Sequence, residues 1–199
     1  MSSDALAISS DADRQTGQTP RNRRQEETFR KVLAAGIETL REKSYADLTV
    51  RAVAARAKVA PATAYTYFSS KNHLIAEVYL DLVRQVPYFT DVNDPMPTRV
   101  EQVLRHLALV VADEPELTAA CGAALMADDP AVTPLREQIG EEVARRIGAA
   151  LGPGWPRAVK STLQMTFSGA LMTARFISFA EIAGQLDEAV NLILGASVA

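Results

Sequence analysis

The sequence contains few of the residues from which disulfides, metal sites and enzyme active sites are built. Its 199 residues include a single cysteine, Cys121, and two histidines, His73 and His106. One cysteine excludes an intrachain disulfide and a cysteine metal cluster. A Gly-rich phosphate loop and a His-Glu-x-x-His motif are also missing. We therefore expect no metal, no cofactor and no enzymatic activity.

Long apolar runs are missing as well. No stretch approaches the roughly 20 apolar residues that span a bilayer, and the start of the chain lacks the basic and then apolar pattern of a signal peptide. Apolar residues nevertheless make up 48% of the chain, which is enough for a globular core. The composition predicts a cytoplasmic protein without a membrane partner.

The charge is divided unevenly along the chain. The net charge is −3, but residues 14–73 carry twelve Lys or Arg against five Asp or Glu, and residues 74–199 carry nine against sixteen. Phosphate neutralisation needs local positive charge rather than a basic average. The pattern favours nucleic-acid binding by the first part of the chain, although a charged surface helix without a ligand would produce the same counts.

Apolar residues recur at helical spacing, and no segment alternates like a strand. Residues 1–21 have few large apolar groups and are expected to form a disordered arm. We predict an all-α fold of about nine helices. The predicted helices cover approximately 22–43, 50–57, 61–67, 71–86, 98–112, 115–127, 134–151, 157–183 and 186–196.

The stretch from Thr49 to Lys71 carries clear helix boundaries. Thr49 is a good N-cap, Pro61 can occupy a first helical turn, and Ser69 or Ser70 can cap the next helix. Two short helices bury little apolar surface by themselves, so they need the first long helix as a support. The expected shared core consists of Phe29, Ile37, Val53, Val59 and Phe68.

The side chains expected on the outward side of the second short helix, 61–67, are small or hydroxyl-bearing: Ala62, Thr63, Tyr65, Thr66 and Tyr67. Small residues permit close approach to a major groove, while hydroxyls and methyls can meet base edges and phosphates. The segment therefore predicts a helix-turn-helix that binds DNA.

The run AKVAPATAYTYFSSKNHL, residues 57–74, resembles the signature of the TetR family of bacterial transcriptional regulators. In that family the recognition helix ends in Tyr-x-(His or Tyr)-Phe-x-x-Lys-x-x-Leu. The resemblance covers residues 24–74. It implies a three-helix DNA-binding domain over 22–70, a ligand-binding and dimerisation domain over 71–199, and a homodimeric repressor that a small molecule releases from palindromic operator DNA.

The resemblance also implies roles for individual residues. Thr49 would contact a phosphate through its hydroxyl or the helix N-terminus, Lys71 would meet a phosphate as a point charge, and Thr63 would face the bases. Both tyrosines of 61–67 would hydrogen-bond phosphates. The implied DNA-contacting residues are Thr49, Arg51, Pro61, Ala62, Thr63, Tyr65, Thr66, Tyr67 and Lys71.

Three arginines, Arg21, Arg23 and Arg24, are expected on the flexible arm ahead of the first helix. Arginines on such an arm can enter a narrow minor groove. A solvated tail that does not contact DNA is an equally supported alternative.

The segment departs from the family pattern at three positions. Lys58 stands where the turn usually has Gly and must adopt a left-handed conformation, at a cost of roughly 1 kcal/mol, or reshape the turn. Ala60 replaces the usual Ser cap, and Ala64 replaces a common Leu. These departures bear on the angle at which the helix docks.

The predicted helix 157–183 is apolar on two sides, which suggests that it packs against its own core and against a partner chain. One stripe comprises Val159, Leu163, Ala170, Ala174 and Ile177, and the other comprises Met165, Met172, Phe176 and Phe179. In the resembled family the last two helices form the dimer interface. A central helix in a monomer is the alternative.

The expected ligand pocket is apolar and contains methionines, which favours a hydrophobic effector. His106 is expected in solvent, and Cys121 is expected to be a buried small hydrophobe. The alternatives are a constitutive DNA-binding protein without a ligand and an activator. The candidate pocket residues are Leu82, Val86, Tyr88, Phe89, Met96, Leu104, Leu107, Met126, Met165, Phe167, Met172 and Phe176.

Overall fold

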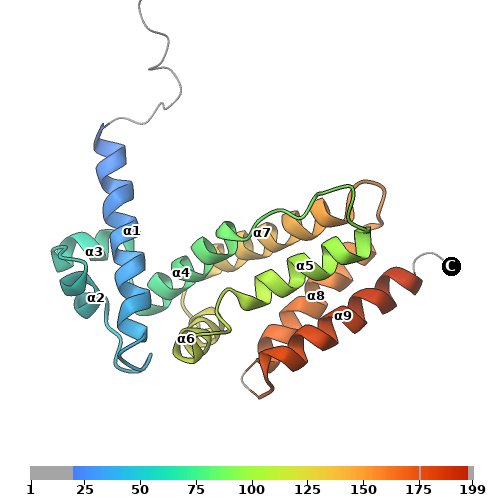
Figure 1. Cartoon of the computed structure of the whole chain (residues 1–199). Helices are drawn as coiled ribbons and strands as arrows, with labels where there is room; N and C mark the ends of the chain where they lie inside the picture. Colours follow the sequence, from blue (N-terminus) through green and yellow to red (C-terminus); the bar gives the residue numbers. More distant parts are fainter. Residues whose placement is uncertain (1–19, 175, 197–199) are drawn as a thin grey trace, which may run out of the picture.

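The computed structural model describes residues 20–174 and 176–196, with the side chains of 23–174 and 176–195. The described part of the chain folds into nine helices and contains no strand, so the all-α prediction is confirmed (Figure 1). The expectation of disorder for residues 1–19 lies outside the described residues. The helices are α1 (Pro20–Leu40), α2 (Val50–Arg56), α3 (Pro61–Tyr67), α4 (Lys71–Gln85), α5 (Met96–Leu109), α6 (Pro115–Met126), α7 (Thr133–Leu151), α8 (Arg157–Thr173) and α9 (Phe179–Ala196).

Helices α1, α2 and α3 pack together at one end of the molecule (Figure 1). The ring of Phe68, fully buried, stacks on that of Phe29 with 5.1 Å between their centroids. Val53 is also fully buried, and the remaining members of the expected core are half-buried against it. The predicted small core is therefore confirmed. It is what holds α3 in place, because only Ala64 of that helix is itself buried.

Helix α4 belongs to both halves of the molecule. It packs against α1 on one side and against α6 and α7 on the other. Its buried residues occupy most of its circumference: Leu74, Ile75, Ala76, Val78, Tyr79, Leu80 and Val83. A helix buried on several sides cannot move without repacking both neighbours, so α4 joins the helix-turn-helix rigidly to the C-terminal bundle.

The first helix begins earlier than expected. Backbone helix starts at Pro20, where the fixed φ of proline suits the first helical position. Arg21, Arg23 and Arg24 therefore lie in the first two turns of α1, and the prediction that a flexible arm carries them is wrong. The Arg23 side chain is exposed.

The prediction of one helix over 157–183 is also wrong. Helix α8 ends at Thr173, and α9 begins at Phe179 and folds back along α8 (Figure 1). Ser178 and Glu181 form a capping box at the N-terminus of α9. The Ser178 backbone N–H and hydroxyl donate to Glu181 Oε2 at 2.9 and 2.8 Å, and the Glu181 N–H donates to Ser178 Oγ at 3.3 Å. The Ser-x-x-Glu pattern is a recognised helix start. The sequence-based prediction missed it because the apolar stripe continues past the end of α8.

Within the described residues, no helix combines the length and the hydropathy that crossing a membrane requires.

Candidate DNA-reading surface and effector cavity

Helix α3 presents a small, uncharged face to solvent. Pro61 occupies its first turn, and Ala60 precedes it without a side-chain cap, as expected from the sequence. The exposed residues of α3 are Pro61, Ala62, Thr63, Tyr65 and Thr66. Tyr67, expected on the outward side, is instead half-buried, because its ring packs edge-on against that of Phe29. The Thr66 hydroxyl donates to the Thr63 carbonyl at 2.6 Å, so its methyl group remains free for an apolar contact.

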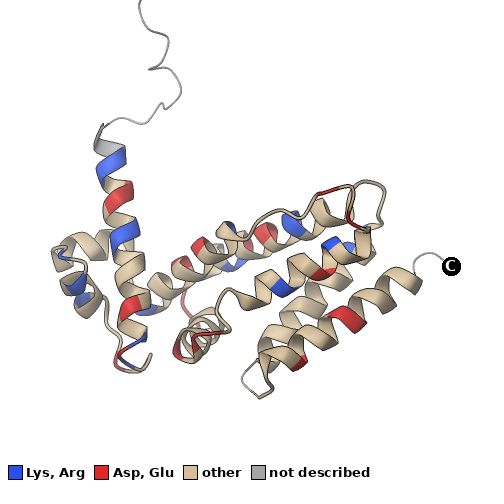
Figure 2. Cartoon of the chain, viewed as in Figure 1, with Lys and Arg blue, Asp and Glu red and all other residues tan. Residues whose placement is uncertain are grey.

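Basic residues flank this face. Figure 2 shows α3 without charge and Lys or Arg on the neighbouring α1 and α2, whereas α9 carries acidic residues only. Arg51 is exposed. Arg56 is paired with Glu42 and, at 3.6 Å, with Glu38, so its charge is largely neutralised within the chain. Positive charge near α3 therefore comes from exposed residues such as Arg51 rather than from Arg56.

The turn between α2 and α3 takes the left-handed form. Lys58 has φ of 55°, a conformation that favours glycine. Its N–H donates to the Ala55 carbonyl at 3.2 Å, and the Val59 N–H donates to the Ala54 carbonyl at 2.9 Å. These bonds close the C-terminus of α2. Lys58 thus preserves the turn at an energetic cost.

Thr49 is the N-cap of α2, as predicted. Its hydroxyl oxygen accepts a hydrogen bond from the Ala52 N–H at 3.1 Å, and the residue is exposed. The hydroxyl proton is free to bond a phosphate oxygen, because the cap uses only the oxygen lone pair.

Lys71 has a role inside the fold that the sequence did not reveal. Its Nζ donates to the carbonyls of Tyr45 and Ala46 at 3.0 and 3.2 Å and lies 4.6 Å from the centroid of the Tyr45 ring. An ammonium has three donors, so one remains for a phosphate. The phosphate contact stays a prediction.

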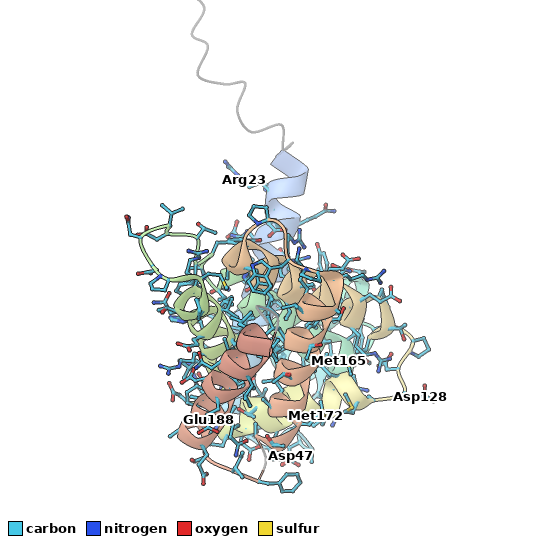
Figure 3. All side chains as sticks on the ribbon, turned by 90° about the vertical axis from the view of Figure 1, so that its right-hand side faces the viewer. Arg23, Asp47, Asp128, Met165, Met172 and Glu188 are labelled. Carbon is cyan, nitrogen blue, oxygen red and sulfur yellow. The ribbon has the colours of Figure 1, made fainter. Side chains whose placement is uncertain are left out.

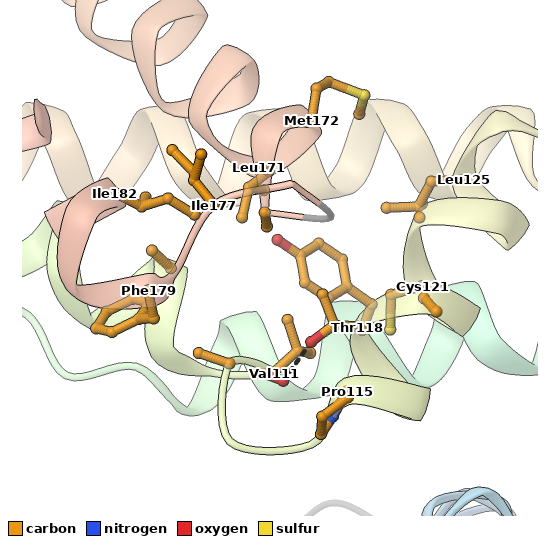
Figure 4. Close-up of a pocket in the computed structure, with 16 residues that line it drawn as sticks. Val111, Pro115, Thr118, Cys121, Leu125, Leu171, Met172, Ile177, Phe179 and Ile182 are labelled. Carbon is orange, nitrogen blue, oxygen red and sulfur yellow. Dashed lines mark hydrogen bonds between the residues drawn. The ribbon is translucent and has the colours of Figure 1, made fainter.

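A cavity of about 410 Å³ opens where the α5–α6 connection meets the turn between α8 and α9 (Figure 4). Its size and mainly apolar lining are typical of a small-molecule site. The lining residues are Tyr79, Ala108, Val111, Ala112, Pro115, Thr118, Ala119, Cys121, Gly122, Leu125, Leu171, Met172, Ala174, Ile177, Phe179 and Ile182.

Of the polar side chains that line the cavity, Tyr79 and Cys121 are buried and Thr118 is half-buried. The Thr118 hydroxyl donates to the Val111 carbonyl, the dashed line in Figure 4. Cys121 is buried as expected, and burial raises the pKa of its thiol to about 12. Burial also raises the pKa of Tyr79, whose hydroxyl has no hydrogen-bond partner within the described structure. All three groups are therefore uncharged at neutral pH.

Of the twelve candidate pocket residues, Met172 alone lines this cavity. The cavity lies at the C-terminal end of α5 and not beside its middle, which is why residues further along α5 are in the solid core. The other eleven candidates lie outside the cavity lining. Four are buried in the core: Val86, Leu104, Leu107 and Phe167. Three are half-buried, Leu82, Phe89 and Met96, and four are exposed, Tyr88, Met126, Met165 and Phe176. The helical pattern of apolar residues could not predict which of them line the cavity, because the position of the cavity depends on where α8 ends.

Apolar side chains of α8, α9 and the connection between them are exposed to solvent. Met165, Phe176 and Leu192 are 74%, 82% and 74% exposed, and Figure 3 shows Met165 and Met172 together on this side of the molecule. Phe179, expected in the same outward stripe, lines the cavity instead because it begins a new helix. We call the set Met165, Met172, Phe176 and Leu192 the outer apolar face.

His106 is exposed, as expected, with Nδ1 2.8 Å from the Gln102 carbonyl oxygen. Its ring centroid lies 4.7 Å from that of Phe89. These contacts explain its position without a ligand.

Comparisons with known proteins agree with this architecture. The family described as bacterial regulatory proteins, tetR family, matches residues 32–78. An uncharacterised HTH-type transcriptional regulator of Mycobacterium tuberculosis (strain H37Rv) is 64% identical over 98% of this chain and 94% of its own length. The HTH-type transcriptional repressor KstR of Rhodococcus jostii RHA1 is 26% identical over 86% and 84% of the two chains. A TetR transcriptional regulator from Rhodococcus sp. RHA1 has a similar fold, with a TM-score of 0.76 and 22% identity over 87% of this chain and 98% of its own.

Proposed function

Because the chain belongs to the TetR family of bacterial transcriptional regulators, we propose that it is a repressor that binds a palindromic operator as a homodimer. A small hydrophobic molecule in the cavity releases it. The observation that carries the DNA-binding part is the exposed, uncharged face of α3 on a folded helix-turn-helix. Members of this family are regulators and not enzymes, and this one acts in the cytoplasm, where its DNA lies.

In this proposal α3 enters the major groove. Thr63 reads a base with its free hydroxyl, and Thr66 offers its methyl group, which suits the methyl of thymine. Tyr65, 51% exposed, bonds a phosphate. Thr49 and Lys71 position the helix on the backbone, because phosphate contacts fix orientation while base contacts specify sequence.

The outer apolar face supports the homodimer. Exposed apolar patches on a helix pair mark interaction sites, and burying each large side chain contributes about 1.5–3 kcal/mol. A two-fold axis at α8 and α9 pairs identical faces and leaves both copies of α3 free to reach successive major grooves, roughly 34–36 Å apart.

Two polar contacts connect the cavity wall to the helix-turn-helix. Glu114, beside the lining residue Pro115, forms a bidentate pair with Arg41 just beyond α1. Asp129, after α6, accepts from the Ser70 hydroxyl at 2.5 Å and from Asn72 Nδ2 at 3.3 Å at the start of α4. A molecule that pushes α6 outward therefore changes the spacing of the two α3 helices. Operator binding in turn weakens effector binding by the same factor.

A footprint on the DNA upstream of the chain's own coding region tests the DNA-binding proposal. We expect protection of a two-fold symmetric site by the wild-type protein and by Tyr88→Ala, an exposed tyrosine far from α3 in sequence. We expect Tyr65→Ala to lose protection. Equal footprints for both variants would reassign the DNA-binding surface, and a wild-type protein that binds this DNA no better than random DNA would overturn the choice of operator.

A further inference from the structure

Among the described residues, the Tyr79 hydroxyl is a buried polar group at the cavity without a hydrogen-bond partner. Tyr79 lies on α4 and is 2% exposed, and its hydroxyl has no hydrogen-bond partner in the described part of the chain. Most buried hydroxyls in proteins have a partner, and an unpaired one destabilises the fold. Phenylalanine would fill the same volume without that cost. A bound molecule that accepts a hydrogen bond would satisfy this hydroxyl, which the described residues leave without a partner.

The remaining lining limits what that partner can be. The described lining residues include no Asp, Glu, Lys, Arg or His. The Thr118 hydroxyl already donates within the wall, and the Cys121 thiol is a weak donor at most. Leu125, Leu171 and Ile177 contribute purely apolar surface. A carboxylate would lose its hydration in such a site without gaining a counter-ion from the described lining.

We propose that the effector is an uncharged, largely apolar molecule with an oxygen acceptor, a carbonyl or an alcohol, that accepts a hydrogen bond from the Tyr79 hydroxyl. This rests on the effector-dependent release proposed above and names its ligand class. Tyr79 donates because its phenol stays protonated. Since Tyr79 is on α4, the ligand bonds directly to the helix that continues from the helix-turn-helix.

The neutral fluorescent ketone 6-propionyl-2-(dimethylamino)naphthalene is a suitable probe, because its emission responds to hydrogen bonding at its single carbonyl. Its dissociation constant is measured for wild-type protein, for Tyr79→Phe and for Tyr88→Phe as the matched control outside the cavity. We expect Tyr79→Phe to weaken binding about three- to tenfold, the size of one hydrogen bond, and to shift the bound emission to the blue. Tyr88→Phe should match the wild type.

The melting temperature without a ligand supplies an independent readout. Tyr79→Phe should melt higher than the wild type, because it removes a buried hydroxyl that has no partner among the described residues. A merely structural tyrosine would show the opposite sign, a lower melting temperature with unchanged ketone binding, and that result would overturn the proposal.

The charge of the ligand is tested with 6-(dimethylamino)-2-naphthoate, which replaces the ketone with a carboxylate. We expect it to bind at least about 100-fold more weakly than the ketone. Equal or tighter binding of the carboxylate, or no binding of the ketone, would contradict the assigned class. The operator footprint of unliganded protein is recorded in parallel. Its persistence separates failure of this ligand assignment from failure of the DNA-binding proposal.

Discussion

Arg41 and Glu114 join the end of α1 to the connection between α5 and α6 through two parallel hydrogen bonds. Arg41 Nε donates to Glu114 Oε2 at 2.9 Å, and Nη2 donates to Oε1 at 2.5 Å. The hydrogen bond from Arg41 holds the pKa of the Glu114 carboxyl below its usual range. The pair spans 73 positions of sequence and is a direct polar link between the helix-turn-helix and the cavity wall.

Replacing Arg41 with Gln should reduce the release of DNA by the effector more than it reduces the stability of the fold. Both side chains reach solvent, so the melting temperature should change little. The effector concentration that half-releases the operator should rise severalfold, because α6 then moves without carrying α1. Arg105→Gln, which breaks a comparable bidentate pair with Asp187 between α5 and α9, is the control. Equal loss of control in both variants would contradict the link.

Thr63 and Tyr65 should separate base reading from backbone contact. Thr63→Val keeps the shape but removes the hydroxyl, so the preferred operator sequence should change, with about 1–3 kcal/mol less discrimination at one base pair. Tyr65→Phe should weaken binding to all sequences to a similar extent. Titrations against a set of single-base operator variants measure both effects. Uniform weakening by Thr63→Val would reassign Thr63 to the phosphates.

The outer apolar face should control the oligomeric state. Met165→Asp and Phe176→Asp should each shift the protein to monomer, because a carboxylate buried in a symmetric interface has no counter-charge there. Sedimentation velocity at micromolar concentration measures the shift. Met126→Asp, an equally apolar and 63% exposed position at the end of α6, should remain dimeric. A dimer in all three variants would place the interface elsewhere.

Arg146 should contribute strongly to stability. It is 2% exposed, bonds Glu142, and donates to the carbonyls of Val86 and Arg84 at 2.9 and 2.7 Å, which closes the end of α4. Arg146→Met leaves Glu142 and both carbonyls under-satisfied, and should cost about 3–5 kcal/mol in the free energy of unfolding. Arg145→Met is the matched control, because Arg145 pairs with the same Glu142 from an exposed position. Denaturation by urea compares the two, and similar losses would refute the special role of Arg146.

The left-handed turn at Lys58 should be improved by glycine. Lys58→Gly removes a steric cost of about 1–2 kcal/mol and adds about 0.5–1 kcal/mol of unfolded-chain entropy. The net gain should be about 0.5 kcal/mol in urea denaturation. Lys43→Gly, in a turn without positive φ, should instead be neutral or destabilising. A stability loss from Lys58→Gly would mean that the lysine side chain contributes more than its backbone costs.

Local signals predicted the helix-turn-helix in detail. Thr49 and Ser70 are the expected N-caps, and Pro61 lies in the first turn of α3 as expected. These positions were predictable because capping depends on backbone groups within three or four residues. The left-handed φ at Lys58 was also foreseeable, since a short turn between helices leaves few backbone options. The Ser178 capping box was equally local, and it was missed only because the apolar stripe of α8 continues in phase across the break.

The amino-acid sequence by itself determined the all-α class, the helix-turn-helix core around Phe68 and the exposed face of α3, since each depends on periodicity and caps within a short stretch. Only the tertiary structure decided which apolar side chains enclose the cavity. That outcome depends on the angles between α4, α6 and α8 and on where α9 turns back, and side chains with the same helical periodicity can fill a core, line a hollow or face solvent. Tyr79 illustrates the difference. Its place in the helical pattern marks a core residue, but only the packed helices show that its hydroxyl lacks a partner among the described residues.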